Sequence, residues 1–269
     1  MSKNVKVSYY PCGQMKYQEY WENGKLNGLT TGWYENGNKR VEVYYKNNKR
    51  DGSWTAYFPN QKIQQIKNNK NGKLNGLSTE WDEDGNKLLE EYYKNGKPDG
   101  CRTEWFENGN KQLEIHYKNG KQDGVNRRWN EKGKLLLMVP VSNGKKNGIE
   151  VGWHEDSNTY SFTEVKDGKA NGFMNHVYED GTQRYLGNYI KGKLEGVLTE
   201  WHKNGRKSSI GIWKNGKRDG CFTFWYEDGS KEQEQVYKNG KQIGNTVVFD
   251  RNGKKTEMVE WNNKQFAVG

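Results

Sequence analysis

The chain has 269 residues, with 44 Lys and Arg against 34 Asp and Glu, so its formal net charge at neutral pH is +10. Hydrophobic residues make up only 31% and Gly contributes 33 residues, which argues against a thick core of two packed layers. Aromatic residues reach 13%, including 11 Trp, and this abundance argues against intrinsic disorder.

The first residues have no apolar segment typical of a signal peptide, and no run of 18 apolar residues suggests a membrane span. The three cysteines are an odd number, so a disulfide framework is not expected and a reducing compartment fits. We therefore expect a cytoplasmic protein.

A repeat of 24 residues runs through the whole chain. One glycine series recurs without any insertion, at Gly28, Gly52, Gly76, Gly100, Gly124, Gly148, Gly172, Gly196, Gly220 and Gly244. Ten of the eleven Trp fall in two aromatic columns with the same period, one beginning at Trp33 and the other running from Trp21 to Trp261. Such periodicity identifies a repeat protein, so residues 1–269 are expected to form a single array.

In chain order, a partial unit at 1–27 precedes ten units of 24 residues at 28–267. Each unit contains two short runs rich in Thr, Trp and Tyr, near 29–33 and 41–45 in the first full unit, bounded by Asn-Gly or Asp-Gly. This pattern predicts β-hairpins. The expected fold is all-β: an elongated antiparallel meander of about eleven hairpins and 22 strands, forming a twisted single-layer ribbon in which aromatic columns replace a core.

The apolar positions predict the turn and the register. Leu29, Thr31 and Trp33 in the first strand have the same parity as Val41 and Val43 in the second. A three-residue loop, made of a type I turn and a left-handed glycine such as Gly37 or Gly85, would pair Trp33 with Lys39, Thr31 with Val41 and Leu29 with Val43. We therefore expect these apolar residues to share one face.

The repeat is least regular in its second and sixth units. The second carries Pro59, Gln61 and Asn69, and the sixth carries Ser157, while Pro140 falls within an expected strand between them. These departures predict a bend near 138–165, unless they reflect only relaxed selection on a structural repeat.

The units resemble MORN-type repeats, in particular the bacterial MORN-variant subfamily. The segments Trp213-Lys-Asn-Gly216-Lys-Arg-Asp-Gly220 and Tyr93-Lys-Asn-Gly96-Lys-Pro-Asp-Gly100 match the aromatic-x-x-Gly-x-x-x-Gly core of that family. Bacterial chains of this subfamily are often described as antitoxins or immunity partners of toxins. The resemblance therefore implies a binding scaffold, and it supplies no residue-level site.

Catalytic and metal-binding motifs are not found, so we expect no enzyme activity, cofactor or metal. The Asn-Gly-Lys strings lack the helix that a phosphate loop requires. His154 and His202 occupy one repeat position roughly 19 Å apart, too far for a shared metal, and are expected at the surface. Cys101 and Cys221 are expected to be small buried residues, and Cys12 is expected to be an exposed thiol at a turn.

Charge follows the repeat. Lysines form an unbroken column beside one set of turns, at Lys25, Lys49, Lys73, Lys97, Lys121, Lys145, Lys169, Lys193, Lys217 and Lys241. Glutamates lie by the opposite turns, at Glu35, Glu83, Glu107, Glu131, Glu155, Glu179 and Glu227. Solubility of an elongated sheet explains the lysines; steering of an acidic partner or an anionic surface is the functional alternative. Nucleic acid is not the expected ligand, because Glu is interleaved and no known nucleic-acid module is present.

The second face of the sheet varies between units and is expected to bind a partner. Its candidate contact residues are Trp54, Phe58, Phe162, Met174, Tyr178, Phe222, Phe224 and Tyr226. The alternative is that these rings pack within a curled ribbon. Charges on the terminal strands, at Lys3, Lys6, Glu257, Glu260 and Lys264, disfavour edge-to-edge growth and favour a monomer.

Together these observations predict a non-enzymatic, protein-binding repeat scaffold, specifically an antitoxin or immunity-type inhibitor whose partner is a toxin or effector. The alternative function is peripheral attachment to anionic lipid through the lysine edge.

Overall fold

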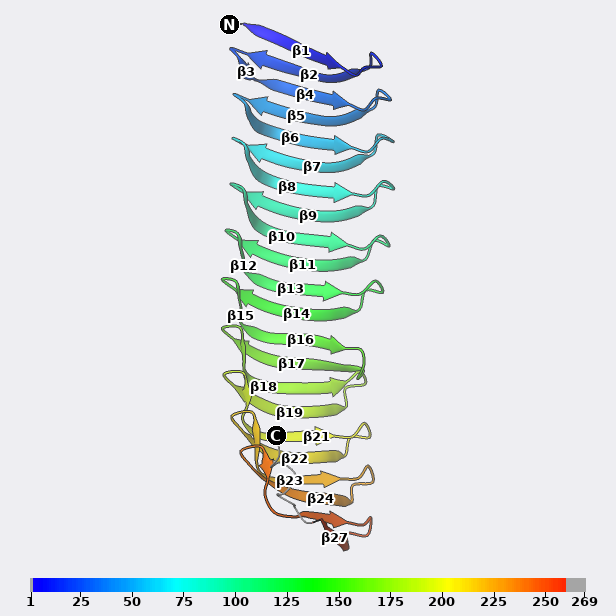
Figure 1. Cartoon of the computed structure of the whole chain (residues 1–269), viewed down its shortest axis with the longest axis vertical. Coiled ribbons are helices and arrows are strands. Elements are labelled where there is room, and N and C mark those ends of the chain that lie inside the picture. Colours follow the sequence, from blue (N-terminus) through cyan, green and yellow to red (C-terminus); the bar gives the residue numbers. More distant parts are fainter. Residues whose placement is uncertain (1, 260–269) are drawn as a thin grey trace, which may run out of the picture. The chain divides into compact units, whose positions relative to one another are not determined.

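A computed structural model describes residues 2–259 and contains only β-strands and turns (Figure 1). The predicted fold class is confirmed: each strand pairs antiparallel with its neighbours in the chain. The chain divides into two compact units. Unit 1 comprises the residues up to Leu135 together with Val141–Gly144, and unit 2 comprises Leu136–Pro140 and the residues from Lys145 onward.

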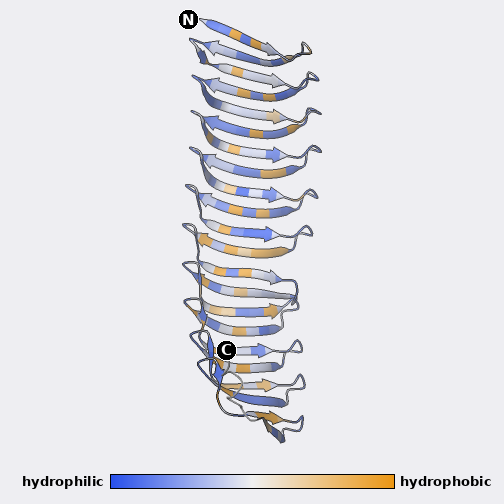
Figure 2. Cartoon of the chain, viewed as in Figure 1, coloured by the Kyte–Doolittle hydropathy of each residue, from blue (hydrophilic) through white to orange (hydrophobic). Residues whose placement is uncertain are grey.

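The strands of unit 1, with β14 at the division, are β1 Lys3–Tyr9, β2 Met15–Glu22, β3 Lys25–Leu26, β4 Gly28–Trp33, β5 Lys39–Lys46, β6 Lys49–Tyr57, β7 Ile63–Lys70, β8 Lys73–Trp81, β9 Lys87–Lys94, β10 Lys97–Trp105, β11 Lys111–Lys118, β12 Lys121–Gln122, β13 Gly124–Trp129 and β14 Leu135–Ser142. Figure 2 shows β14 as hydrophobic over most of its length, whereas the turns are hydrophilic.

The strands of unit 2 are β15 Lys145–Lys146, β16 Gly148–His154, β17 Thr159–Lys166, β18 Lys169–Tyr178, β19 Gln183–Ile190, β20 Lys193–Leu194, β21 Gly196–Trp201, β22 Lys207–Lys214, β23 Lys217–Trp225, β24 Lys231–Lys238, β25 Lys241–Gln242, β26 Thr246–Phe249 and β27 Lys255–Val259. Five two-residue strands each precede a longer strand, across a one-residue gap for β3, β12, β15 and β20 and a three-residue gap for β25. Counted with the strands that follow them, the described part of the chain has the 22 strands expected.

The predicted turn is confirmed in the first full hairpin. Trp33 lies opposite Lys39, the Gly37 amide donates to the Tyr34 carbonyl at 3.0 Å, and Gly37 has a φ of 85°. This is a type I turn followed by a left-handed glycine, a conformation that glycine adopts without steric cost.

The predicted register beyond the turn is wrong. Thr31 lies opposite Glu42 instead of Val41, because the register shifts by one residue between Gly32 and Trp33. Two residues, Arg40 and Val41, span this interval in β5, so the strand contains a β-bulge. A one-residue shift moves a whole side-chain set to the other face of a sheet.

The shift separates residues that were expected to share a face. The open face carries Leu29, Thr31 and Trp33 of β4 with Glu42 and Tyr44 of β5 and their repeat equivalents. The packed face carries Thr30 and Gly32 with Val41 and Val43 and their equivalents, and it includes the variable positions Trp54 and Phe222.

The packed face holds the buried apolar residues, and the aromatic columns do not form the core that was expected. The largest buried apolar side chains are Val43, Val139, Val141, Val165, Met174, Leu198 and Phe222. By contrast, Trp33 and its equivalents in the open-face column are half-buried, and Trp261, expected to end the second column, lies outside the described residues.

Two members of the Gly28 series show why glycine recurs at this position. Gly28 has a φ of 121°, and a Cβ there would lie 3.2 Å from the Cβ of Tyr20 on the preceding strand. Gly52 meets Tyr44 at the same distance. The glycine therefore serves both the backbone conformation and the close approach of an open-face side chain.

The irregular sixth repeat remains ordered, because β16 and β17 pair continuously from Gly148 with Val165 to His154 with Thr159. This hairpin lacks the bulge seen in the first full hairpin, and Thr159 is fully buried. The bend expected near 138–165 concerns the placement of the two units and stays a prediction.

Candidate functional site

The lysine edge lies along one side of each unit. Each lysine of the column begins a strand after a two-residue turn and is exposed. A second lysine often lies directly opposite, in the pairs Lys46–Lys49, Lys70–Lys73, Lys94–Lys97, Lys118–Lys121, Lys166–Lys169, Lys214–Lys217 and Lys238–Lys241. Like charges directly opposite each other destabilise a sheet, so this edge accumulates positive charge beyond what turn formation requires.

Hydrogen bonds between consecutive turns occupy the backbone at this edge. The Gly240 amide donates to the Arg218 carbonyl at 2.8 Å, and the Asn239 amide donates to the Asp219 carboxylate at 3.1 Å. Equivalent bonds join Gly120 to the Pro98 carbonyl and other turns along both units. These amides already have hydrogen-bond partners within the chain and are therefore not free to cradle a phosphate.

The opposite edge carries the exposed glutamates, with a second ladder between turns. The Tyr34 hydroxyl donates to the Tyr57 carbonyl at 2.8 Å in the next repeat. Near the end of unit 2, Arg251 lies over the Tyr226 ring at 4.8 Å and pairs with Asp228 at 2.6 Å. Hydrogen bonds from Ser230, with the Arg251 guanidinium, lower the pKa of Asp228 to about 2.

The predicted partner-binding residues do not form one surface. Trp54, Met174, Phe222 and Phe224 lie on the packed face. Met174 is 9% exposed and Phe222 is 4% exposed, so both pack within the sheet. Trp54 is half-buried between Val43 and Lys67, whose ammonium lies 5.3 Å from the indole.

The remaining predicted residues lie elsewhere in the repeat. Phe162 is on the open face, because its neighbour Thr163 pairs with the packed-face residue Met174. Phe58, Tyr178 and Tyr226 each begin a turn at the glutamate edge and are half-buried.

An aromatic cluster surrounds Phe222 on the packed face of unit 2. Its ring lies 5.2 Å from Tyr237 and 6.1 Å from Trp213, both nearly edge-on. The Arg218 guanidinium lies 4.9 Å from the Phe222 centroid and donates to the Tyr237 hydroxyl at 3.1 Å. This cluster is filled by the protein's own cation, so it stabilises the unit more than it offers a binding site.

A histidine pair lies in unit 2, which sequence spacing did not reveal. The rings of His154 and His176 stack at 5.4 Å, and His154 Nε2 lies 2.8 Å from Ser161 Oγ. Burial, with the nearby His154 and Arg184 charges, lowers the pKa of His176 to about 4. The pair arises because β17 lies between β16 and β18 and brings residues 22 positions apart onto one face.

The cysteines and the metal-ligand types give no further site. Cys12 is exposed as expected, Cys101 is half-buried, and Cys221 is exposed, so the expected burial of Cys221 is wrong. Cys221 is exposed because its strand position belongs to the open face. Within residues 2–259, no three His, Cys, Asp or Glu side chains converge on a potential metal position.

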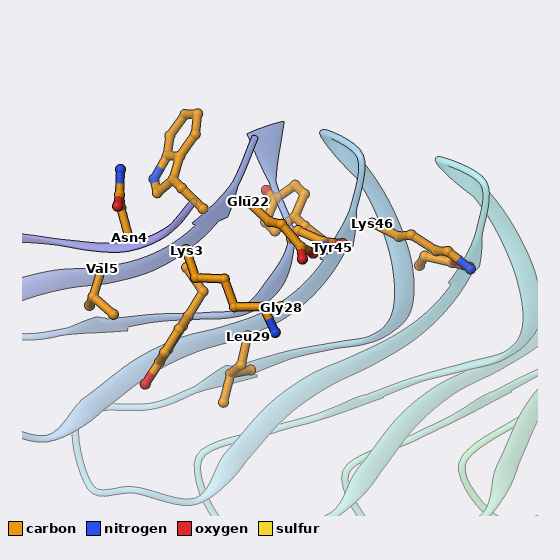
Figure 3. A pocket seen from close by; sticks show the side chains of 12 residues that line it. Lys3, Asn4, Val5, Glu22, Gly28, Leu29, Tyr45 and Lys46 are labelled. Carbon is orange, nitrogen blue, oxygen red and sulfur yellow. Dashed lines mark hydrogen bonds between the residues drawn. The ribbon is translucent and has the colours of Figure 1, made fainter. Parts of the chain in front are cut away.

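A groove lies at the first strands of unit 1 (Figure 3). Val5 and Leu29 contribute apolar surface, while Lys3, Glu22 and Lys46 place charges of both signs around it. Lys3 lies directly opposite Glu22 on the neighbouring strand. Because the charges oppose one another, this groove favours no single ligand chemistry.

Sequence analysis missed the exposed apolar residues of the open face, because the wrong register assigned the first-strand and second-strand members of this face to opposite sides of the sheet. In unit 1 they include Tyr44, Leu77 and Tyr92, and in unit 2 they include Val197 and Ile212. Leu77 pairs with Tyr92, and Val197 pairs with Ile212. Isolated repeat departures could have identified some of them, since Ile243 replaces a residue that is polar in all nine earlier units.

Comparison with family models matches the description "MORN repeat variant" at residues 26–47, 74–95, 98–119 and 218–239. These four segments each join two strands across a turn of the glutamate edge. The comparison with curated proteins finds no match. In the part of the chain that the structure describes, no helix is long and apolar enough to cross a membrane. The matched segments agree with the resemblance inferred from the repeat itself: four segments of the chain are similar to the MORN repeat variant, a repeat type that suggests a scaffold.

Proposed function

We propose that this chain is a non-enzymatic scaffold that binds another protein and acts as an antitoxin or immunity-type inhibitor. The observation that carries the proposal is the exposed apolar surface of the open face, where Val197 and Ile212 are 52% and 47% exposed. Soluble proteins rarely leave neighbouring aliphatic side chains uncovered without an interaction to make. A stoichiometric inhibitor needs an extended complementary surface and no chemistry, which suits a repeat array.

The half-buried rings predicted from the sequence contribute to the same role. Trp54, Phe58, Phe162, Tyr178, Phe224 and Tyr226 retain exposed surface from which they can contact a partner. Met174 and Phe222 act indirectly, by supporting the packed face. The lysine edge raises the encounter rate with an acidic partner.

The test is capture of a partner by the full chain in its native host, followed by purification and titration calorimetry of the reconstituted complex. We expect a defined stoichiometry and suppression of the partner's toxic activity when the two are co-expressed. Replacing both Trp54 and Phe224 with Ala should weaken binding by at least about tenfold. The proposal fails if no protein binds with defined stoichiometry, or if the bound protein's activity is unaffected.

A second candidate function is attachment to anionic membranes, and the cross-strand lysine pairs are the observation that favours it. In unit 1, Lys94–Lys97 and Lys118–Lys121 belong to consecutive hairpins and are exposed. Such attachment would weaken steeply with added salt. Sedimentation with phosphatidylserine vesicles at physiological salt, compared between the chain and a Lys94→Glu, Lys97→Glu variant, distinguishes this candidate from protein binding.

A further inference from the structure

An apolar patch lies on the open face of unit 2, beside the lysine edge. It consists of Ile190, Val197, Ile212, Val236 and Ile243, which are 50%, 52%, 47%, 42% and 43% exposed. Strand pairing places Val197 directly opposite Ile212, and the Ile243 amide donates to the Val236 carbonyl at 2.8 Å. The patch is therefore a continuous feature of neighbouring strands.

Two members of the patch break the repeat. The repeat position of Ile190 holds Lys, Glu, Ser or Asn in every other unit, and that of Ile243 holds Asp, Asn or Glu in all nine earlier units. Both replacements put an aliphatic side chain on the surface where turn chemistry calls for a polar one. In repeat proteins, departures from the shared pattern at exposed positions mark a specialised surface.

Lysines of the lysine edge lie next to this patch. Lys193 lies opposite Ile190, and the pairs Lys214–Lys217 and Lys238–Lys241 follow on the next hairpins. Among these five described lysines, only Lys238 forms an ion pair, with Asp219 at 3.2 Å. The patch thus combines an apolar strip with a row of cations whose charge is largely uncompensated.

The spacing of the patch matches an α-helix lying across the strands. Val197, Ile212, Cys221 and Val236 fall on four consecutive strands, β21 to β24, and so span about 14 Å. Lysines of successive hairpins are about 10 Å apart. A helix rises about 1.5 Å per residue, so acidic residues seven positions apart would recur every ~10.5 Å and meet successive lysines.

The shape of the patch favours a protein over a bilayer. About half of each aliphatic side chain is covered by the sheet. Ile212 lies against Gly220: a Cβ added to Gly220 would be 3.5 Å from both the Cβ and the Cδ1 of Ile212. Membrane-surface elements insert their apolar face about 5–10 Å below the headgroups, whereas these short side chains lie along a nearly continuous backbone surface.

From these observations we infer that the patch binds an acidic amphipathic helix of the partner protein, with apolar residues on the strip and heptad-spaced carboxylates on the lysines. Helices recognised in this way present i, i+3, i+4 and i+7 anchors to an apolar surface. The inference rests on the proposed protein-binding function and adds the chemistry of the partner segment.

The experiment titrates the full chain with a fluorescent 21-residue peptide that has Leu at heptad positions a and d and Glu at e and g. We expect saturable binding that weakens with salt and is lost when Lys replaces each Glu of the peptide. The variant Val197→Asp, Ile212→Asp should weaken binding at least about tenfold. The matched control, Leu77→Asp with Tyr92→Asp, changes the same two repeat positions in unit 1 and should bind as the parent does.

Circular dichroism and thermal unfolding verify that both variants fold, which the surface position of all four residues favours. Equal loss in both variants, or equal binding of the Lys peptide, would overturn the inference. Binding to 3:1 phosphatidylcholine–phosphatidylserine vesicles without peptide binding would assign the patch to a membrane. A dimer of the chain that dissociates in the Val197→Asp, Ile212→Asp variant would assign it to a second copy.

The failure of this inference is distinguishable from the failure of the proposed function. If the natural partner still binds the Val197→Asp, Ile212→Asp variant with parental affinity, the patch is not its docking site and the scaffold function stands. If no protein forms a complex with the parent chain, the function itself fails.

Discussion

Two directly opposed positions on the packed face are filled differently in the two units. In unit 1, Arg102 lies opposite Glu91; in unit 2, the equivalent positions hold Phe222 opposite Gly211. Arg102 bonds the Glu91 carboxylate at 3.3 Å, whereas Phe222 occupies the space above Gly211, where a Cβ would lie 2.1 Å from the ring. One hairpin backbone therefore accepts either an ion pair or an aromatic ring on glycine.

The side chains around the Arg102–Glu91 pair are polar, whereas those around Phe222 are mainly aromatic. In unit 1, Arg102 also bonds Glu104 at 2.6 Å, and the Tyr93 hydroxyl donates to Glu91 at 2.7 Å. Burial and the Glu91 carboxylate raise the pKa of Tyr93 to about 12. Polar networks contribute little net stability when each charge must lose water, so we expect unit 2 to depend more strongly on its packed face.

The largest expected effect is the removal of the Phe222 ring. Phe222→Ala should lower the free energy of unfolding by about 3 kcal/mol, because a buried aromatic side chain is lost and Gly211 leaves no neighbour to fill the gap. Chemical denaturation measures the loss, and hydrogen exchange locates it in unit 2. A loss below about 1 kcal/mol would show that the packed face of unit 2 contributes no more than ordinary surface positions.

The matched change in unit 1 tests the ion pair. Arg102→Ala should cost about 1–2 kcal/mol, less than a fully buried pair because Arg102 is partly exposed and screened. The cost arises because Glu91 is only 5% exposed and, without Arg102, its carboxylate retains the hydrogen bond from the Tyr93 hydroxyl but loses its ion pair.

The double variant Arg102→Phe, Glu91→Gly transfers the unit 2 arrangement into unit 1. We expect it to unfold within about 1 kcal/mol of the parent chain, because an apolar pair of suitable shape replaces a buried ion pair at little cost. With the single variants Arg102→Phe and Glu91→Gly, the four unfolding curves form a double-mutant cycle that measures the coupling of the two positions. Additive losses would mean that the two positions act independently.

Acidification should affect unit 2 selectively through His176. Its pKa is about 4 in the folded chain, against an ordinary value of 6.5, so the unfolded chain takes up the proton first. The free energy of unfolding is therefore highest above about pH 6.5, where His176 is neutral in both states, and it decreases as the pH falls toward 4. His176→Gln should remove this decrease between pH 6.5 and 4, whereas the control His202→Gln should retain it. Chemical denaturation at several pH values measures both. If the free energy of unfolding varied with pH in the same way in the parent and in His176→Gln, His176 would not be the residue responsible.

The smallest effect should be the same in both units, because the turn ladder is shared. Asp219 accepts the Asn239 amide, and the equivalent Asp123 accepts the Asn143 amide at 3.1 Å. Asp219→Ala and Asp123→Ala should each cost about 1 kcal/mol, the usual net contribution of one such bond. Thermal unfolding with hydrogen exchange measures both losses. Unequal losses would show that the units differ in their turns as well as on their packed faces.

The turns could be predicted because their cause is local. Glycine at position 37 and Asn-Gly at 23–24 demand left-handed backbone conformations, and the structure has φ values of 85°, 50° and 74° there. The lysine edge follows directly, since a residue fixed next to each turn recurs at every hairpin. The hairpins and the positions of the turns could therefore be predicted from the sequence without knowledge of any tertiary contact.

The faces could not be predicted, because the deciding feature is one extra residue in a strand. The bulge at Arg40 and Val41 leaves no sequence signal that differs from regular alternation, yet it reverses which side chains share a face. As a result, Phe222 and Met174 were expected on a binding surface and are instead buried. For the same reason the predicted register separated Val197 from Ile212, which the structure places opposite each other on one face.

The sequence alone determined the 24-residue period, the hairpins, the two charged edges and the resemblance to variant MORN repeats, because each depends on residues close together in the chain. Tertiary structure decided which face is packed, brought His154 onto His176, and left a row of aliphatic side chains open beside the lysines. Those outcomes depend on strand register, which is set by hydrogen bonds between strands and by the space each glycine leaves for its neighbour.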